Sequence, residues 1–306
     1  FLFKDNKVKV VFGDEDFINK SGRRHSPHFK GSWNRELFWS NPFNFNSWVI
    51  SSDEWNKAIK YLKNAKVEFN HFSIISQITL SLEYKNELNL IKHLPYILYH
   101  NFEENILNQK KEFEINTSFL YSLILNNSSK LGICKKILFD KLSLVNKFHW
   151  HLSPQSKLSI IIPIRDKVTY LKSCINSILK YPPGLPFEIF IINNDSKEIE
   201  TKLFLKEFIK NSNYDFTKKI IDHPGVFNFS EMNNNVAKKV KGNVILFLNN
   251  DVEFLKPNWG YELASNALRP GIGFVGGRLL YKDHTIQHAG VILGIGGIAG
   301  HSLKYS

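Results

Sequence analysis

GNVILFLNNDVE, residues 242–253, is the stretch that decides the fold of the C-terminal half of this chain. Its apolar run, residues 244–248, predicts a strand that is buried on both faces. Asn249, Asn250 and Asp251 follow directly, at the end of the strand where open α/β sheets bind ligands. Their carboxylate and amide oxygens suit Mg²⁺ or Mn²⁺ better than zinc. The alternative is a polar turn after a core strand.

Strands and helices alternate through residues 157–306, which predicts a parallel, right-handed α/β sheet. The apolar runs that predict strands lie at residues 158–162, 187–192, 219–222 and 244–248. The runs that predict the intervening helices lie at residues 170–180, 201–211 and 230–240. Polar residues follow three of these strands: Arg165 and Asp166, Asn193 and Asn194, and the group Asn249–Asp251. Because parallel strands end at one edge of their sheet, we expect these side chains to form one ligand site.

The composition is that of a packed globular protein, with 43% hydrophobic and 14% aromatic residues. A formal net charge of +12 fits a phosphate-bearing ligand, an anionic membrane surface or a nucleic acid. The lysines are scattered without a basic block or an aromatic platform, which favours a solvated surface and argues against nucleic-acid binding. Cys134 and Cys174 form neither a disulfide framework nor a metal site, so we expect a reducing, cytoplasmic compartment. No apolar run approaches the roughly 18 residues of a spanning helix, and no signal peptide is visible.

Residues 1–105 repeat the pattern of a β-rich run followed by acidic residues. Residues 8–12 predict a strand, and Asp14 and Asp16 follow it on either side of a glutamate. In an extended chain both aspartates point to the same side, where two carboxylates need a cation or a proton. An acidic surface turn is the alternative. Helices are predicted at residues 52–64 and 74–84, and a further strand at residues 92–100.

Residues 106–156 predict a connector between two domains. Helical periodicity in residues 112–128 and 131–147 indicates a pair of helices, and no residue there carries chemistry that we can identify. We therefore expect a domain at residues 1–105, a helical connector, and a second domain at residues 157–306.

The motifs of the second domain resemble, as a set, the nucleotide-binding half of a family 2 glycosyltransferase with the GT-A fold. They are LSIIIPIRDKVTYLKSCINSIL (158–179), FEIFIINNDS (187–196), FNFSEMNNNVAKKVKGNVILFLNNDVEFLKPNW (227–259) and IQHAGVILGIGGIAGH (286–301). The resemblance implies a Rossmann-like, mostly parallel sheet with flanking helices. It also implies that the nucleotide-sugar-binding residues are Pro163, Arg165, Asp166, Asn193, Asn194, Asn234, Asn249 and Asn250.

Within that set, the resemblance places Asp166 and Asn193 near the base and ribose, and Asn234 near the diphosphate. Asp251 would hold the metal, with an asparagine in place of the first Asp of the family's Asp-x-Asp. The residues that would line the sugar or acceptor side are Gln287, His288 and His301. For His288, a structural, hydrogen-bonded histidine is the alternative. Gly294, Gly296, Gly297 and Gly300 indicate a mobile loop, because no strand-to-helix context fits a dinucleotide fingerprint.

The first domain resembles the second half of the same fold, through VVFGDEDFINKSGRR (10–24), PHFKGSWNRELF (27–38) and HLPYILYH (93–100). The resemblance implies that Asp14 and Asp16 hold the metal of a nucleotide sugar and that His100 completes its shell. The family's catalytic helix carries an acidic general base, but the corresponding stretch here contains Gln77. Gln cannot accept a proton as a carboxylate does, so an inactive first domain is an alternative.

The resemblance as a whole implies a tandem, inverting glycosyltransferase that builds bacterial surface polysaccharide from nucleotide-diphosphate sugars, with Mn²⁺ or Mg²⁺ as cofactor. The acceptor would be a glycan or a lipid-linked glycan, and association with the inner face of the cytoplasmic membrane is a further expectation. The general base of the second domain would lie beyond Ser306, so the chain is expected to be a fragment. One alternative is a non-catalytic nucleotide- or glycan-binding module. A nucleotidyltransferase is disfavoured, because residues 163–166 are not a Gly-rich phosphate loop.

Overall fold

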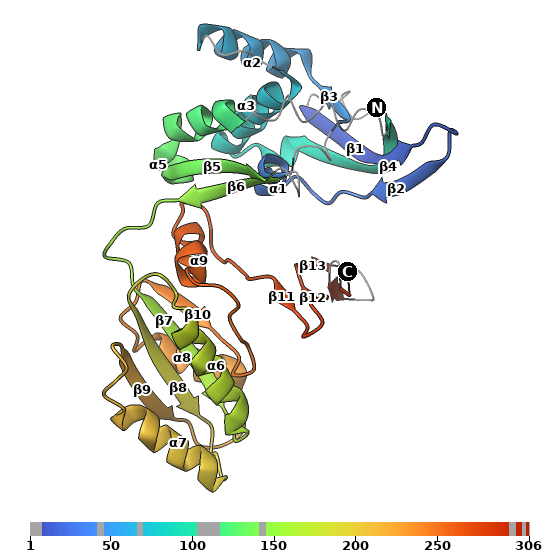
Figure 1. Ribbon diagram of the computed structural model, residues 1–306. Helices are drawn as coiled ribbons and strands as arrows, with labels where there is room; N and C mark the ends of the chain where they lie inside the picture. The colour runs from blue at the N-terminus through green and yellow to red at the C-terminus, as the bar shows by residue number, and fades with distance from the viewer. Residues whose placement is uncertain are drawn as a thin grey trace. The chain divides into compact units, whose positions relative to one another are not determined.

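The computed structural model describes residues 8–41, 46–65, 70–102, 117–140, 145–293, 298–301 and 304–305. The chain divides into two compact units, residues 1–149 and 150–306, hereafter unit 1 and unit 2 (Figure 1). The boundary between the units falls between His149 and Trp150, a few residues before residue 157, where the sequence predicts the start of the second domain.

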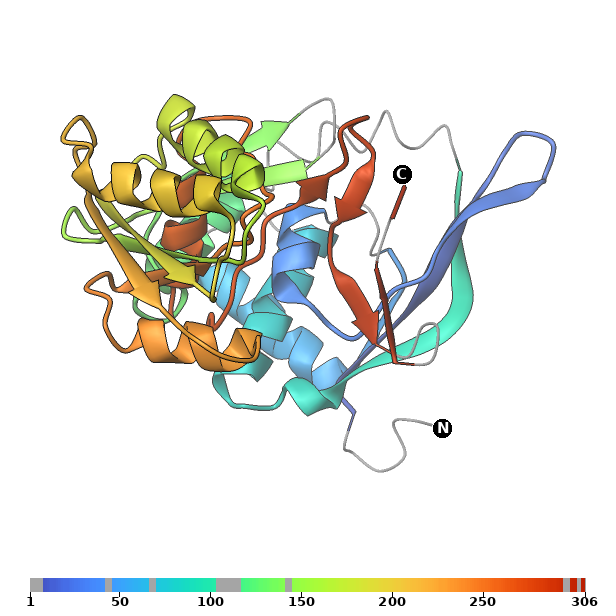
Figure 2. The same ribbon diagram turned by 90° about the horizontal axis from the view of Figure 1, so that it is seen from below.

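Unit 1 is built on a sheet around one central strand. The strands of this sheet are β1 (Val10–Ile18), β2 (Arg24–His28), β3 (Trp48–Ile50) and β4 (Ile91–Phe102). The helical elements of the unit that precede residue 91 are α1 (Arg35–Ser40), α2 (Ser52–Asn64), α3 (His71–Tyr84) and the 3₁₀ turn Leu88–Leu90. β2 and β3 pair antiparallel with β1, and β4 pairs parallel with it. The β1–β2 hairpin and β4 run alongside each other in Figure 2. The strands and the two longer helices predicted for this region are confirmed, but the first strand does not end before the acids: β1 continues through Asp14 and Asp16 to Ile18.

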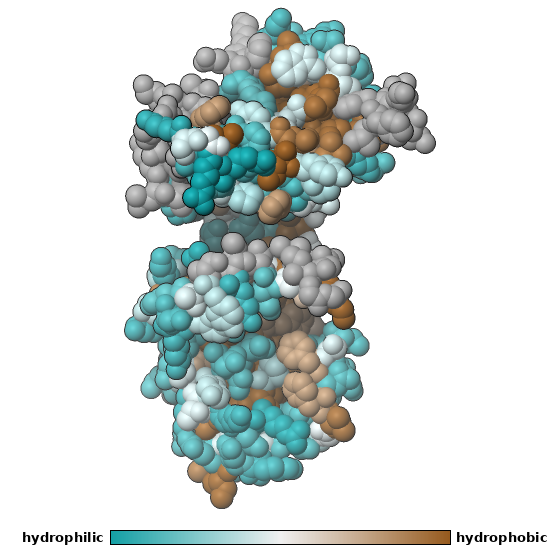
Figure 3. Space-filling model, turned by 90° about the vertical axis from the view of Figure 1, so that its right-hand side faces the viewer, coloured by the Kyte–Doolittle hydropathy of each residue, from teal (hydrophilic) through white to brown (hydrophobic). Residues whose placement is uncertain are grey.

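The core of unit 1 follows from the apolar start of β1. Phe12 is buried and packs against Trp48, with ring centroids 5.3 Å apart, and Trp48 also contacts Trp33 at 5.6 Å. β4 turns other apolar side chains outward, and Figure 3 shows apolar surface on unit 1. The exposed apolar residues of β4 are Tyr96, Leu98, Tyr99 and Phe102.

The predicted helical connector is only partly helical. Residues 117–126 and α5 (Ser128–Leu131) are helical, but the helix predicted at residues 131–147 is wrong. Gly132 has φ 91°, in the left-handed region where an L residue is strained, and it ends the helix. After it, β5 (Cys134–Asp140) and β6 (Val145–Trp150) form a two-stranded sheet.

The described residues of this connector up to His149 belong to unit 1, and those from Trp150 onward belong to unit 2. Asn146 Nδ2 donates to the Trp39 carbonyl oxygen at 2.8 Å. The Lys130 ammonium lies 3.9 Å from the centroid of the Tyr84 ring. These contacts place β6 and α5 against α1 and α3.

Unit 2 contains the predicted parallel α/β sheet, with strand order β10-β7-β8-β9. Its strands are β7 (Leu158–Ile164), β8 (Phe187–Asn193), β9 (Thr217–Asp222) and β10 (Val244–Phe247). Its helices are α6 (Val168–Lys180), α7 (Ile199–Lys210), α8 (Phe229–Ala237) and α9 (Trp259–Ala267). Ile189 and Ile191 of β8 pack with α6 and α7, whereas Phe190 and Ile192 pack with α8. Because successive residues of a strand face opposite sides, α8 covers the face opposite α6 and α7.

The expectation that residues 244–248 are buried on both faces is wrong for one face. β10 is an edge strand, paired with β7 alone among the strands that the structure describes. Leu246 packs with the core on the α6 side, but Ile245 is 37% and Phe247 46% exposed. α8 covers their side of the sheet over β7 and β8 and leaves β10 open.

A buried carboxylate, Glu188, joins the beginnings of three strands of unit 2. It accepts hydrogen bonds from Lys157 Nζ at 2.9 Å, Ser159 Oγ at 2.6 Å and the Lys241 amide at 2.7 Å. Burial acts to raise the pKa of Glu188, but these hydrogen bonds prevail and lower its pKa to about 2. The charged carboxylate therefore stabilises the edge of the sheet opposite the strand ends where ligands are expected.

The C-terminal part of unit 2 forms two short hairpins. They are β11 (Leu279–Leu280) with β12 (Ile286–His288), and β13 (Val291–Leu293) with β14 (Ala299–His301). Gly294, Gly296 and Gly297, for which the sequence predicts a mobile loop, lie outside the described residues.

Candidate functional site

A pocket of about 320 Å³ lies at the carboxyl ends of the neighbouring strands β7 and β10. Its lining residues come from these strand ends and the turns after them, from the start of α6, and from the loop before α8 and the first residue of α8: Pro163, Ile164, Arg165, Lys167, Tyr170, Phe227, Phe229, Asn249, Asn250 and Asp251. The predicted convergence of polar residues at this edge therefore holds for two of the three strand ends. It brings together Pro163, Arg165, Asn249, Asn250 and Asp251.

The turn after β7 shapes one wall of the pocket. Asp166 and Lys167 have φ values of 56° and 52°, a left-handed conformation that costs free energy for residues other than Gly. The turn is held by the chain before α7, because Asp166 Oδ1 accepts hydrogen bonds from the Lys197 and Glu198 amides at 2.7 and 2.9 Å. Asp166 thus supports the wall that carries Arg165 and Lys167, and it does not itself line the pocket.

Cationic, anionic and aromatic side chains share this pocket. Among the residues that the structure describes, neither Arg165 nor Asp251 has an ion-pair or hydrogen-bond partner for its side chain. Tyr170, Phe227 and Phe229 are each about half exposed, so their ring faces are accessible. The pocket therefore offers unsatisfied charges beside aromatic surface, which is unlike an ordinary polar turn.

The amides after β8 have structural roles instead of lining the pocket. Asn193 Nδ2 donates to Asp222 Oδ1 at 2.8 Å, which joins the ends of β8 and β9. Asn194 is fully buried, and its Nδ2 donates to the His223 carbonyl at 2.8 Å. Asn234 is exposed on α8 and does not line the pocket.

The residues expected on the sugar or acceptor side lie on the C-terminal hairpins. Gln287 and His288 belong to β12, and His301 ends β14. The two imidazoles meet, with their Nδ1 atoms 3.1 Å apart. None of the three lines the pocket, so their assignment to the sugar or acceptor stays a prediction.

Asp251 has the chemistry to hold a divalent cation. Asp251 is exposed, its carboxylate has no partner among the described residues, and Asn249 and Asn250 line the same pocket. Within the described part of the chain, no group of three or more His, Cys, Asp or Glu side chains could hold a metal ion. Mg²⁺ and Mn²⁺ commonly take one or two protein carboxylates, with water and substrate phosphates as the remaining ligands. The residues present fit such a cation.

The acidic residues of β1 are in a different environment. Asp14 Oδ1 accepts from the Lys30 amide at 2.8 Å and contacts His93 Nε2 at 2.7 Å. The Asp16 carboxylate accepts a hydrogen bond from Arg24 Nε at 2.6 Å and is also hydrogen-bonded to His100 Nδ1. Burial acts to raise the pKa of Asp16, but the bonds from His100 and Arg24 lower it overall. A metal at Asp14, Asp16 and His100, which the resemblance implies, would have to displace the Arg24 guanidinium.

Glu15, between these aspartates, forms a buried ion pair. Lys30 Nζ lies 2.8 Å from Glu15 Oε1 and donates to the Gly13 carbonyl at 2.6 Å. Asn46 Nδ2 and Asn101 Nδ2 donate to the other carboxylate oxygen at 3.0 and 3.1 Å. Burial lowers the pKa of Lys30, although Glu15 acts to raise it. The three acids of β1 are therefore bonded within the fold of unit 1.

Five pocket residues were not predicted: Ile164, Lys167, Tyr170, Phe227 and Phe229. Phe227 and Phe229 flank Asn228, the N-cap of α8, whose side chain accepts from the Glu231 amide at 3.1 Å. The sequence signal that could have identified these two residues is their position: both are aromatic, lie next to a helix N-cap, and are outside the buried face of the helix. No sequence pattern identifies Lys167, because its place depends on the left-handed turn.

Residues 159–292 match the family model Glycosyl transferase family 2. "O-antigen biosynthesis protein RfbC" of Myxococcus xanthus is 28% identical over 297 residues, covering 96% of this chain and 22% of that protein. "Uncharacterized protein y4gI" of Sinorhizobium fredii (strain NBRC 101917 / NGR234) is 28% identical over 298 residues, covering 96% and 32%. This chain thus spans less than a third of either relative.

A solved structure, the mannosyltransferase PcManGT from Pyrobaculum calidifontis in complex with GDP-Man and Mn²⁺, is similar over 40% of this chain and 36% of that one, with 11% identity and a TM-score of 0.35. In the described residues, no helix is long and apolar enough to cross a membrane. The motifs, the parallel α/β sheet and the family match agree for residues 159–292, which are similar to a family 2 glycosyltransferase domain.

Proposed function

We propose that the pocket at the ends of β7 and β10 binds the nucleoside diphosphate of a sugar donor, and that the sugar passes to a glycan acceptor. The observation that carries this proposal is the unpartnered Asp251 carboxylate in the same pocket as Arg165 and three aromatic side chains. A donor of this class has an aromatic base, an anionic diphosphate and affinity for a divalent cation. Each of these parts has a complementary group in the pocket.

The roles of the pocket residues follow from their chemistry. Tyr170, Phe227 and Phe229 offer ring faces on which a base stacks. Arg165 and Lys167 attract the diphosphate, and the Arg165 guanidinium matches phosphate oxygens in a bidentate geometry. When bound by Asp251, a divalent cation would supply positive charge at the departing diphosphate.

The acceptor hydroxyl requires a general base that this pocket does not contain. Asp251 is the one carboxylate among the lining residues, and we assign it to the cation. We therefore propose that these residues provide donor binding and leaving-group stabilisation. The acceptor that we propose is a glycan or lipid-linked glycan of a surface polysaccharide, supported by the name of the Myxococcus xanthus relative. Inversion at the anomeric carbon remains a prediction.

For unit 1, a non-catalytic role is a second proposal. The helix that would present a general base, α3, carries Gln77 at the expected place. Its one carboxylate, Glu83, is paired with Arg35 Nη1 at 2.6 Å. The acids of β1 are likewise hydrogen-bonded or ion-paired within unit 1. We therefore propose that unit 1 has a structural role and does not transfer a sugar.

Calorimetric titration of UDP, GDP and dTDP, each with and without Mn²⁺, tests the donor site. We expect one of the three to bind in the presence of Mn²⁺ and Phe229→Ala to weaken that binding about fivefold, since base–aromatic stacking contributes roughly 1–3 kcal/mol. Phe274→Ala is the matched control, because Phe274 is 96% exposed and lies outside the pocket. Failure of all three nucleotides to bind the folded wild-type chain would overturn the donor-site proposal.

A further inference from the structure

The turn after β7, at Asp166 and Lys167, is held by the segment between β8 and α7. The Asp166 amide donates to Ser196 Oγ at 3.0 Å, and the Lys167 amide donates to Glu198 Oε2 at 3.0 Å. In the opposite direction, the Lys197 and Glu198 amides donate to Asp166 Oδ1. These four hydrogen bonds, hereafter the clamp, join residues that lie 30 to 32 positions apart in the sequence.

The turn lacks the side-chain cap that usually stabilises the start of a helix. Lys167 is the N-cap of α6, and its ammonium group cannot accept the hydrogen bond that a capping side chain normally accepts from the first turn. Asp166 and Lys167 are also both left-handed, a conformation that persists in such residues only where surrounding contacts impose it. We therefore attribute the conformation of the turn to the clamp.

The clamp residues are themselves fixed by their surroundings. Ser196 is 3% exposed, and its amide donates to Asn193 Oδ1 at 3.2 Å, at the end of β8. Glu198 Oε2 also accepts a hydrogen bond from Thr201 Oγ1 at 3.3 Å, and Thr201 is fully buried in α7. The clamp thus ties the turn after β7 to the end of β8 and the start of α7.

The turn carries the cations of the donor pocket. Arg165 and Lys167 line the pocket on either side of Asp166, whereas Glu198 does not line it. We propose that Glu198 is a positioning residue of the donor site: by binding the Lys167 amide, it holds the Arg165 and Lys167 side chains where the diphosphate binds. This role rests on the proposed donor function of the pocket.

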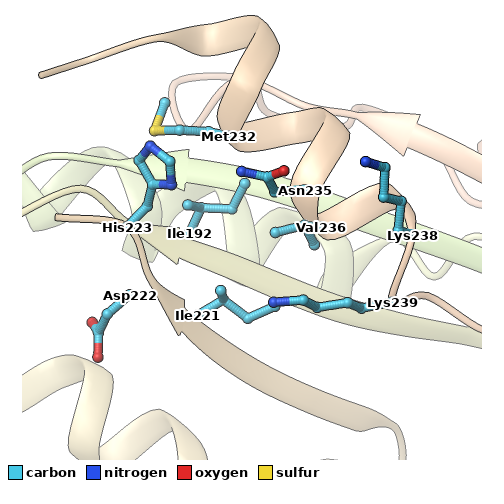
Figure 4. Close-up of a pocket in the computed structure, with 9 residues that line it drawn as sticks. All are labelled: Ile192, Ile221, Asp222, His223, Met232, Asn235, Val236, Lys238 and Lys239. Atoms are coloured by element: carbon cyan, nitrogen blue, oxygen red, sulfur yellow. The ribbon is translucent and has the colours of Figure 1, made fainter. Parts of the chain in front are cut away.

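A hollow between β9 and α8 provides a control for the removal of positive charge (Figure 4). Its apolar side chains, Ile192, Met232 and Val236, are buried in the core beneath α8. Lys238 and Lys239, which follow α8, are exposed, and neither lines the donor pocket. Replacing both with Gln therefore removes two positive charges from unit 2 without altering the pocket.

Three single variants separate positioning from stability. Glu198→Ala removes the acceptor of the Lys167 amide and should weaken Mn²⁺-dependent binding of a nucleoside diphosphate about fivefold, as expected for loss of one hydrogen bond to a charged group. Glu198→Gln keeps an oxygen acceptor at this position and should bind within about twofold of wild type. Glu200→Ala is the matched control, because it removes a carboxylate that pairs with Lys172 of α6 at 2.8 Å and does not contact the turn. Calorimetry measures the affinities, and the urea midpoints of all three variants should agree.

A double-mutant cycle tests whether Glu198 acts through the pocket cations. In Arg165→Gln/Lys167→Gln protein, Glu198→Ala should change the remaining affinity less than about twofold, because the side chains that it positions are gone. In Lys238→Gln/Lys239→Gln protein, which has the same net charge, Glu198→Ala should again weaken binding about fivefold.

Wild-type affinity in the Glu198→Ala variant would overturn the positioning role and leave the donor site standing. Equal losses in Glu198→Ala and Glu198→Gln, or an undiminished loss in Arg165→Gln/Lys167→Gln protein, would also overturn it, because the effect would then not pass through the turn. Failure of the wild-type chain to bind any of UDP, GDP and dTDP would instead overturn the donor-site proposal, and the positioning role with it.

Discussion

The acidic residues that follow the apolar part of β1 and those that follow β10 have similar local sequences and opposite environments. Asp14, Glu15 and Asp16 are buried, and each carboxylate is bonded to donors within unit 1. Asp251 is exposed, and the structure gives its carboxylate no partner among the described residues. Acidic residues that follow an apolar run can therefore either be bonded inside a fold or be left exposed at a pocket.

The position of each strand in its sheet accounts for this difference. β1 has β2 and β3 on one side and β4 on the other, so it continues through Gly13 and its acids become interior residues. β10 ends at Phe247 and pairs with β7 alone among the described strands. The residues after Phe247 leave the sheet, and their side chains reach the pocket.

The largest expected effect comes from breaking the interior network of unit 1. Lys30→Met leaves the Glu15 carboxylate buried without its cation, which costs about 3–5 kcal/mol of the free energy of unfolding. Urea denaturation followed by tryptophan fluorescence measures this loss, because Trp39 and Trp48 are in the affected unit. Nucleotide binding by unit 2 should be retained at urea concentrations where that unit stays folded.

Two further variants serve as controls for Lys30→Met. Lys60→Met removes an exposed lysine from α2 and should leave the unfolding midpoint unchanged. Adding Glu15→Gln to Lys30→Met removes the unpaired charge and should restore part of the lost stability. A Lys30→Met protein as stable as wild type would show that the ion pair is dispensable.

Much of the fold could be predicted from the sequence. The alternation of apolar strands and amphipathic helices identifies the sheet of unit 2, and periodicity alone identifies α2 and α3. The hairpin of β5 and β6 could not be predicted that way, because the apolar residues of 131–147 fit a helical period as well as a strand. Gly132, with φ 91°, ends the helix before β5, and this conformation is not evident from the sequence alone.

The candidate site could be predicted only in part, because contacts between residues distant in the sequence determine which side chains line it. Asn249, Asn250 and Asp251 could be located because strand ends have a fixed place in a parallel sheet. Asn193 satisfies the same rule, yet its amide bonds to Asp222 of the next strand. Which polar residues stay open depends on partners distant in the sequence, and a single sequence does not identify them.

A second prediction concerns the buried acid of unit 2, which lies at the other end of the strands from Asp251. Glu188→Gln weakens three hydrogen bonds and should cost about 2–3 kcal/mol near neutral pH, as expected for bonds to a charged group. Because the pKa of Glu188 falls from its usual 4.5 to about 2, this stability is fully present above pH 4.5. It is lost as the pH falls through 2.

Thermal unfolding between pH 7 and pH 2 measures this prediction. The wild-type chain should lose its advantage over Glu188→Gln as the pH falls from about 4.5 to 2, so that the two curves converge. Glu207→Gln, an exposed change on α7, should follow wild type throughout. A constant difference between Glu188→Gln and wild type down to pH 2 would mean that the charge of Glu188 is not what stabilises the sheet.

The smallest expected effect bears directly on the contrast between the two acidic clusters. Asp251→Asn should weaken Mn²⁺-dependent nucleotide binding about 10- to 30-fold, or roughly 1.4–2 kcal/mol, because an amide oxygen replaces the carboxylate beside the cation. It should leave the unfolding midpoint unchanged, since Asp251 is exposed and unpartnered among the described residues. Asp16→Asn should do the reverse, because Arg24 and His100 lose a charged partner while the pocket is untouched. If Asp16→Asn abolished Mn²⁺-dependent binding with stability intact, unit 1 would hold the metal, as the family resemblance implies, and its network would be a ligand site closed in the absence of metal.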